Sequence, residues 1–339
     1  MIGSGDTRRR AVLLLVAALV LMTAFSTSYI GAFHDPSPRD VPFAVVAPEG
    51  RATQLADRLD ALPGSPLDVR VARDRAAALA LVRDREVYGA YDAGANRLYV
   101  ASAANRATAT ALELTLGRAL AAQALPAAAV QDVAPLPDWD PNGTTLFYLV
   151  VAWVFGGYFA ATVLGLLAGP RSSTRRLAVD RLLGVLAFAT LGSLLTVLIA
   201  RWSFGVLDTD LLATWAAGIL VIGASGAATV GLQALAGPAG TGLVILLFVI
   251  LGNPAAGGPY ARPLLPDFWS AIGGLLPPGA GMDLLRGVTA FDGARIGGPI
   301  AVLAVWALLG VALTVFHGGR PARSDAETAA EAAAGAAAA

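Results

Sequence analysis

The residue types that carry most enzyme chemistry are scarce in this chain of 339 residues. It contains no cysteine and no lysine, which excludes a thiolate nucleophile, a cysteine-ligated metal site and an ATP-binding loop with its phosphate-binding lysine. The two histidines, His34 and His317, are far apart in the sequence, so a multi-histidine metal site within one chain is not expected. Neither a G-x-S-x-G nor an H-E-x-x-H motif occurs. We therefore expect no catalytic residue, no metal and no cofactor, and we predict that the chain is not itself an enzyme.

The composition instead indicates a protein whose main partner is the lipid bilayer. Hydrophobic residues make up 56% of the chain and charged residues only 14%, with a mean hydropathy of +0.65. Soluble domains carry about 25% charged residues. The net charge is zero, and no basic stripe with interleaved aromatic residues suggests a nucleic-acid partner.

Apolar segments long enough to cross a bilayer recur along the chain. The predicted spans are 11–33, 145–169, 182–200, 211–236, 241–252 and 298–317. The fifth segment is short for a full crossing, so we expect it to continue in broken form into the residues that follow. The predicted fold class is an α-helical polytopic membrane protein with about six transmembrane helices.

Arginines beside the predicted spans predict the orientation in the membrane. Arg8, Arg9 and Arg10 precede the first span, and further arginines lie at 171–181 and at 320–323. Short cytoplasmic segments are enriched in such residues. We therefore expect residues 1–10 and the Ala-rich tail 319–339 in the cytoplasm, in the inner or plasma membrane of a cell. A cleaved signal peptide is the alternative for the first span, but its apolar run is long and no clear A-x-A cleavage site follows.

Residues 34–143, between the first two spans, differ from the rest of the chain in chemistry. Charge rises here, and the apolar residues alternate or recur with helical periodicity in the order βαβαββαβ. This pattern predicts a small α/β or α+β domain that folds as a unit. The predicted orientation places the domain outside the cytoplasm.

Residues 253–291 are crowded with Gly and Pro, although they follow an apolar span and contain many apolar and aromatic residues. Proline cannot continue a helix, so no straight helix can cross this stretch. A broken, aromatic-rich segment beside spans predicts a re-entrant or interfacial element; the alternative is a capped surface loop with one interfacial helix. The candidate residues of an outer gate are Asn253, Pro254, Gly257, Gly258, Pro266, Phe268, Trp269, Pro277, Pro278, Asp283 and Arg286.

Three polar residues in or near the spans are of interest. Asp283 and Arg286 are spaced i, i+3 and can pair on a helix, either as an exposed pair of little energy or as an anchor of the re-entrant helix. Gln233 is expected to make an interhelical hydrogen bond. The span centres otherwise contain almost no ionisable groups, which argues against a transporter coupled to protons or ions.

Three motifs in this stretch carry a family resemblance. They are NPAAGG at 253–258, LLPDFW at 264–269 and LPPGAGMDLLR at 276–286. The run resembles permeases of the type-2 ABC exporter superfamily, and among them it is most similar to the phage-infection-protein (YhgE/Pip-like) and nitrosoguanidine-resistance-like membrane proteins. The layout of one span, an outer domain and five further spans also resembles such a protomer.

The resemblance implies a function and partners. It implies a permease subunit that moves a hydrophobic or amphipathic compound, lipid or drug outward along a path between two protomers of a homo- or heterodimer. A separate ATP-binding subunit would supply the energy. The residues implied to contact it are Arg171, Arg175, Arg176 and Arg181. Plain positive flanks of the spans are the alternative for these arginines, and a non-transporting scaffold or receptor, such as a secretion accessory or phage-entry factor, is the alternative for the chain.

Overall fold

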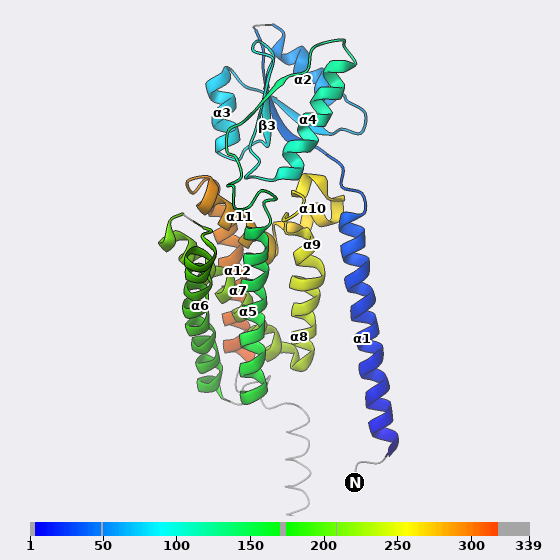
Figure 1. Ribbon diagram of the computed structural model, residues 1–339. Coiled ribbons are helices and arrows are strands. Elements are labelled where there is room, and N and C mark those ends of the chain that lie inside the picture. Colours follow the sequence, from blue (N-terminus) through cyan, green and yellow to red (C-terminus); the bar gives the residue numbers. More distant parts are fainter. Residues whose placement is uncertain (1–3, 49, 170–173, 208, 318–339) are drawn as a thin grey trace, which may run out of the picture. The chain divides into compact units, whose positions relative to one another are not determined.

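The computed structural model describes residues 4–48, 50–169, 174–207 and 209–317, and long helices dominate them (Figure 1). Within this part of the chain, six helical segments are long and apolar enough to cross a membrane, as expected for a multi-pass membrane protein. Their bounds are Ala11–Phe33, Thr145–Leu167, Arg175–Phe204, Leu211–Ala236, Pro238–Ala255 and Gly297–His317. The predicted tail 319–339 lies outside the described residues, and so do residues 1–3 of the predicted N-terminal segment.

The described residues form two compact units. The first unit combines Met1–Leu149 with Leu246–Pro299, and the second combines Val150–Ile245 with the residues from Ile300 onward. The broken segment therefore folds with the first helix and the α/β domain, although about a hundred residues of the second unit separate them in the sequence.

The first unit begins with helix α1 (Ser4–Phe33), which leads into an α/β domain. The elements of the domain are β1 (Val41–Val46), α2 (Ala52–Asp60), β2 (Leu67–Val71), α3 (Arg75–Arg83), β3 (Gly89–Asp92), β4 (Arg97–Val100), α4 (Arg106–Ala121) and β5 (Ala129–Asp132). The sheet order is β2-β1-β3-β4-β5, in which only the β3–β4 hairpin is antiparallel.

Each face of this sheet has its own apolar core, because successive side chains of a strand point to opposite faces. On β1, Phe43 and Val45 belong to the core that α2 and α4 cover. Ala44 between them belongs to the other core, where α3 packs. Figure 1 shows α3 on one side of the sheet and α2 and α4 on the other. Helices α3 and α4 begin at capping residues, Asp74 and Asn105, whose side chains accept backbone hydrogen bonds.

The segment after the fifth span is broken, as its Gly and Pro content predicts. The π-helix η1 (Ile245–Gly252) lies within the fifth span. The broken segment, 253–291, consists of α9 (Asn253–Ala255), a 3₁₀ turn η2 (Arg262–Leu264), α10 (Asp267–Gly273) and α11 (Pro277–Ala290). The alternative of a surface loop is wrong, because every residue from Pro277 to Gly287 except Asp283 is buried. The eight-residue π-helix was not expected; such helices are rare and occur mostly as single turns at functional sites.

The second unit is a helical bundle. It contains most of α5 (Thr145–Ala168), α6 (Arg175–Phe204), α7 (Leu211–Ala236), α8 (Pro238–Val244) and most of α12 (Gly297–His317). The start predicted for the third span, residue 182, is too late: α6 begins at Arg175, where the Thr174 side chain caps it. Hydropathy marks only the apolar part of a helix, and this helix has two polar turns before that part.

Glycines set the closest helix contacts of this bundle. A Cβ added to Gly157 of α5 would lie 2.5 Å from the Ile222 carbonyl oxygen of α7. One added to Gly310 of α12 would overlap the backbone of Ala227 in α7. Small residues let helix backbones approach in this way in lipid. Gly157 and Gly310 therefore mark the places where α5 and α12 contact α7.

Candidate functional site

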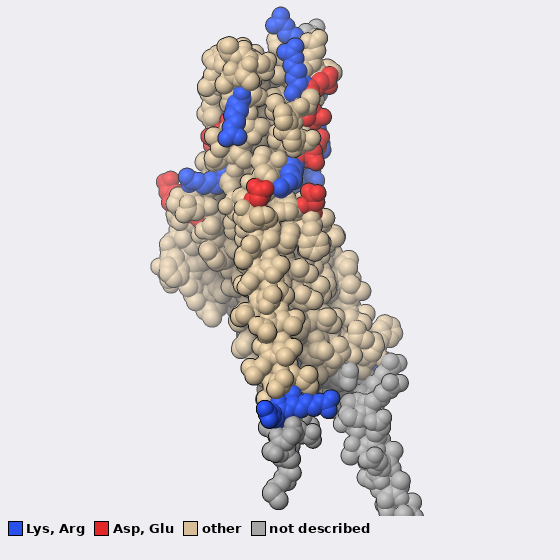
Figure 2. Space-filling view, turned by 90° about the vertical axis from the view of Figure 1, so that its right-hand side faces the viewer, with Lys and Arg blue, Asp and Glu red and all other residues tan. Residues whose placement is uncertain are grey.

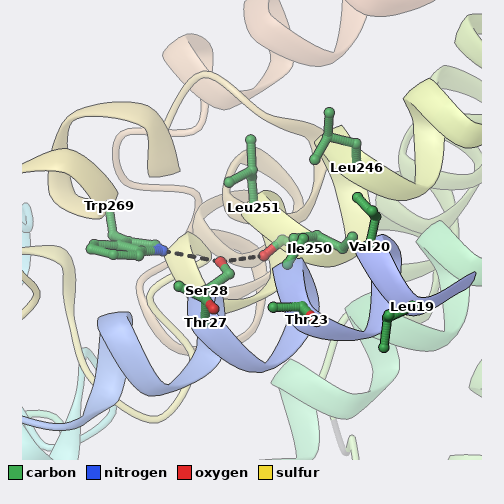
Figure 3. A pocket seen from close by; sticks show the side chains of 10 residues that line it. Leu19, Val20, Thr23, Thr27, Ser28, Leu246, Ile250, Leu251 and Trp269 are labelled. Carbon is green, nitrogen blue, oxygen red and sulfur yellow. Dashed lines mark hydrogen bonds between the residues drawn. The ribbon is translucent and has the colours of Figure 1, made fainter. Parts of the chain in front are cut away.

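An open, largely apolar groove of about 620 Å³ lies between α1 and η1 in the first unit (Figure 3). Leu19, Val20, Thr23, Ala24, Thr27, Ser28, Leu246, Ile250, Leu251 and Trp269 line it. The α1 residues among these recur at helical spacing, so they form one stripe along the helix. The groove therefore lies between two segments that are each apolar enough to lie in a membrane.

Two hydrogen bonds join α1 to η1 and to α10 beside this groove. The Ser28 hydroxyl donates to the Ile250 carbonyl oxygen at 2.5 Å, and the Trp269 indole N–H donates to the Ser28 oxygen at 3.3 Å (Figure 3). The Trp269 ring also packs on α1 at Gly31, where an added Cβ would lie 2.7 Å from the ring. Away from these hydrogen bonds, α1 is exposed; the side chain of Leu14, for example, is 72% accessible. Helix α1 is thus hydrogen-bonded to the rest of the first unit near Ser28, whereas most of its apolar side chains are exposed.

A charged cluster joins the α/β domain to α11. Asp283 on α11 accepts from Arg85, which follows α3, at 3.2 Å, and from Arg262 in η2 at 2.7 Å. A second nitrogen of Arg85 donates to the Asp283 backbone carbonyl at 3.0 Å. Burial lowers the pKa of Arg262, but the nearby Asp283 carboxylate more than offsets this and raises it above the usual value. One carboxylate therefore holds two guanidinium groups from distant parts of the sequence.

Arg286 lies one turn after Asp283, and its environment differs from the expected one. Only 5% of Arg286 is accessible, so the expectation of an exposed pair is wrong. Its guanidinium donates to the Gly258 carbonyl oxygen at 3.1 Å. Burial lowers the pKa of Arg286 to about 10, against the opposing effect of the Asp283 charge. The Asp283 carboxylate is already occupied by Arg85 and Arg262, which is why the local i, i+3 pair does not form.

These charged side chains border a cavity of about 690 Å³. Its lining residues are Pro42, Arg85, Glu86, Val87, Tyr88, Ala104, Arg262, Pro263, Ser270, Asp283, Arg286, Arg295, Gly297, Gly298 and Pro299. The α/β domain contributes the first six, and the chain from η2 to the start of α12 contributes the rest. We call it the arginine cavity. Figure 2 shows blue and red side chains together on the visible face of the α/β domain.

Further hydrogen bonds fasten the α/β domain to the broken segment. The Asn105 side chain caps α4 by accepting from the Thr108 N–H at 3.0 Å, and its amide donates to the Gly258 carbonyl oxygen at 3.0 Å. The backbone N–H of Arg39 donates to the Pro263 carbonyl oxygen at 2.9 Å. Sequence reasoning missed Ser28, Arg85 and Asn105. Only Asn105 carried a signal, because an asparagine before a helical pattern predicts a cap.

The structure distributes the predicted gate residues over several environments. It brings Gly258, Asp283 and Arg286 together at the arginine cavity, and Trp269 lies at the groove. Phe268 is 53% exposed. The remaining residues are structural in their placement: Asn253, Pro254 and Gly257 are buried around α9, Pro266 precedes α10, and Pro277 and Pro278 form the buried start of α11.

The four arginines expected to contact an ATP-binding subunit also differ from one another. Arg175 and Arg176 are exposed in the first turn of α6, and Arg171 lies outside the described residues. Arg181 is only 2% exposed, which corrects the expectation that its side chain is available to a partner. It donates to the Ala161 carbonyl oxygen at 3.3 Å and to the Gln233 side-chain oxygen at 2.5 Å. The interhelical hydrogen bond expected of Gln233 is thereby confirmed.

Comparisons of the chain with protein-family models, with curated proteins and with solved structures found no match. The resemblance to exporter permeases therefore rests on the three motifs and on the layout of the spans. What the groove and the arginine cavity do must be argued from their own chemistry.

Proposed function

We propose that this chain is the permease subunit of an exporter of the type-2 ABC kind. In this proposal it moves a hydrophobic or amphipathic compound, such as a lipid or drug, out of the membrane. ATP is hydrolysed by a separate subunit, because the chain has no lysine for a phosphate-binding loop. A second permease subunit, identical or related, completes the path.

The observation that carries this proposal is the groove between α1 and η1. Its lining is largely apolar, its volume is about 620 Å³, and it opens along a helix whose other apolar side chains are exposed. Ligand pockets commonly have volumes in this range and a mostly apolar lining. A hydrocarbon chain could enter such a groove sideways from the bilayer, without first crossing water.

The connections of the two walls of the groove support a proposal in which η1 moves against α1. One wall, η1, is a π-helix that continues into the broken segment. The other wall, α1, is hydrogen-bonded through Ser28 to Ile250 of η1 and to Trp269 of the broken segment. The broken segment is in turn tied to the α/β domain through Asp283. A displacement of η1 against α1 would therefore change the groove and the contacts of the domain together.

The proposal includes an orientation, with the α/β domain outside the cytoplasm and Arg175 and Arg176 inside it. The arginines beside the spans support this side assignment. Because the chain has no cysteine, single-cysteine variants at exposed Thr53 in α2 and at exposed Arg176 can be labelled without background. An impermeant maleimide added to whole cells is expected to label Thr53→Cys and to spare Arg176→Cys.

The transport test uses the full chain purified from its native membranes with any subunits that remain bound. The complex is reconstituted into vesicles, and the ATP-dependent movement of a fluorescent single-chain amphiphile is measured. Ala24→Trp fills the groove and is expected to slow this movement on the order of tenfold, because the cargo loses its binding site. Leu15→Trp adds the same bulk to an exposed position of α1 outside the groove and is the matched control.

The two outcomes separate transport from scaffolding. Equal rates in Ala24→Trp and Leu15→Trp would remove the groove as the path. If the folded chain co-purifies with no ATPase and moves no amphiphile, the scaffold or receptor function replaces the permease.

A further inference from the structure

The arginine cavity has an unbalanced charge. Four arginines line it, Arg85, Arg262, Arg286 and Arg295, against only two carboxylates, Glu86 and Asp283. Two positive charges are left over. Bringing like charges together in a partly desolvated site costs free energy unless an opposite charge is present.

Arg286 carries one of these uncompensated charges and is deeply buried. Among the described residues no carboxylate lies within ion-pair distance of it, and its one hydrogen bond there goes to the Gly258 carbonyl. A guanidinium has five N–H donors, so most of the donors of this 95% buried side chain remain for a ligand in the cavity that it lines. Its lowered pKa has burial as its main cause and remains high enough to keep the group charged at neutral pH.

We propose that the arginine cavity binds the phosphate monoester head group of an amphiphile. A phosphate monoester carries about two negative charges near neutral pH, which matches the two uncompensated positive charges. Guanidinium groups bind phosphate oxygens through parallel hydrogen bonds, and a partly dry site strengthens them. A cavity of about 690 Å³ has room for the head group and its hydration.

The neighbouring groove supplies the reason to assign an amphiphile rather than free phosphate. Helix α10 takes part in both sites: Trp269 lines the groove, and the next residue, Ser270, lines the arginine cavity. A molecule with an apolar chain and a charged head could therefore occupy both sites in the first unit. This assignment of the cargo rests on the proposed function, whereas anion binding by the cavity does not.

The test measures binding to the purified full chain in nanodiscs of phosphatidylcholine. A short-chain phosphatidic acid is titrated in, and retained lipid is counted by native mass spectrometry. The wild type is expected to prefer phosphatidic acid over short-chain phosphatidylcholine at least tenfold. Arg286→Gln is expected to abolish most of this preference, and Arg286→Lys, which keeps the charge but not the fork, to retain part of it. Arg51→Gln, at an exposed arginine before α2, is the matched control.

A second measurement does not depend on the variants folding. Inorganic phosphate and short-chain phosphatidic acid are each added to the wild type, and thermal unfolding is followed at constant ionic strength. Phosphatidic acid is expected to stabilise at a concentration at least tenfold lower than phosphate does, because a ligand that binds the folded state raises its stability. Equal effects would overturn the assignment of an amphiphile.

The remaining outcomes distinguish the head-group site from the permease function. A wild type without preference for phosphatidic acid overturns the head-group site, even if neutral amphiphiles are exported. A wild type that binds phosphatidic acid through Arg286 but moves no amphiphile keeps the head-group site and removes the permease function.

Discussion

The two units of the molecule differ in the contacts that join their own segments. In the second unit, the closest helix contacts are at glycines, as at Gly157 and Gly310, and the buried Arg181 adds hydrogen bonds between helices. In the first unit, segments distant in sequence are joined by polar side chains: Asp283 to Arg85 and Arg262, and Ser28 to Trp269.

This difference has a physical consequence for movement. Close backbone packing resists any change, because each glycine contact has room for only one arrangement. Charged hydrogen bonds can break and re-form when the charge around them changes. The first unit is therefore where ligand binding and conformational change are expected, and the second unit is expected to act as a rigid support. The following substitutions test this contrast.

Asp283→Asn is expected to have the largest effect. It removes the charge that holds two arginines, and breaking a largely buried ion pair from one side costs about 3 kcal/mol. The free energy of unfolding, measured by tryptophan fluorescence in detergent, should fall by about this amount. Asp292→Asn changes an exposed aspartate beyond the end of α11 and should leave stability nearly unchanged. Equal stability of the two variants would show that Asp283 does not join the domain to α11.

Gly310→Ala should have the next largest effect, in the second unit. The added Cβ meets the backbone of Ala227 rather than a movable side chain, and overpacking of this kind costs about 2 kcal/mol. Thermal unfolding in detergent measures the loss. Gly223→Ala in α7 is the matched control, because nothing lies within 4 Å of the added Cβ there, and it should be neutral or slightly stabilising. A bundle that tolerates both variants equally is not held by close glycine contacts.

Asn105→Ala measures a single connection between the domain and the broken segment. It removes the cap of α4 together with the hydrogen bonds from the Asn105 amide to the Gly258 and Pro259 carbonyls. Asp74→Ala removes the cap of α3 and an exposed ion pair with Arg73, and it touches no part of the broken segment. Loss of a cap costs about 1 kcal/mol in each variant, and the hydrogen bond adds about 1 kcal/mol more in Asn105→Ala. The difference between the two free energies of unfolding measures the contacts of Asn105 with the broken segment, to which an exposed ion pair such as Arg73–Asp74 adds little. Equal free energies of unfolding would show that the hydrogen bond from Asn105 to Gly258 does not stabilise the fold.

Several features of this fold could be predicted from the sequence. Hydropathy marks the spans, because a bilayer demands long apolar runs. The Gly and Pro content of 253–291 predicts the broken segment, because these residues act on their own backbone. The periodicity of residues 34–143 predicts the order βαβαββαβ, which the elements from β1 to β5 follow. Each of these signals depends on residues that are neighbours in the chain.

The arrangement of the candidate site could not be predicted in this way, because it depends on contacts between residues far apart in the chain. The sequence around Asp283 does not indicate that it pairs with Arg85, 198 residues away, rather than with Arg286. Nothing near Arg181 shows that the Ala161 carbonyl and Gln233 would bury it. The π-helix at 245–252 likewise carries no local signature.

The amino-acid sequence by itself determined that this is a membrane protein, which segments are apolar enough to span, and where no helix can continue. Only the tertiary structure decided which arginine pairs with which carboxylate and where charge is left uncompensated. The reason is that burial and charge pairing depend on distances between side chains, and in this molecule those distances are set by contacts between parts of the chain far apart in sequence.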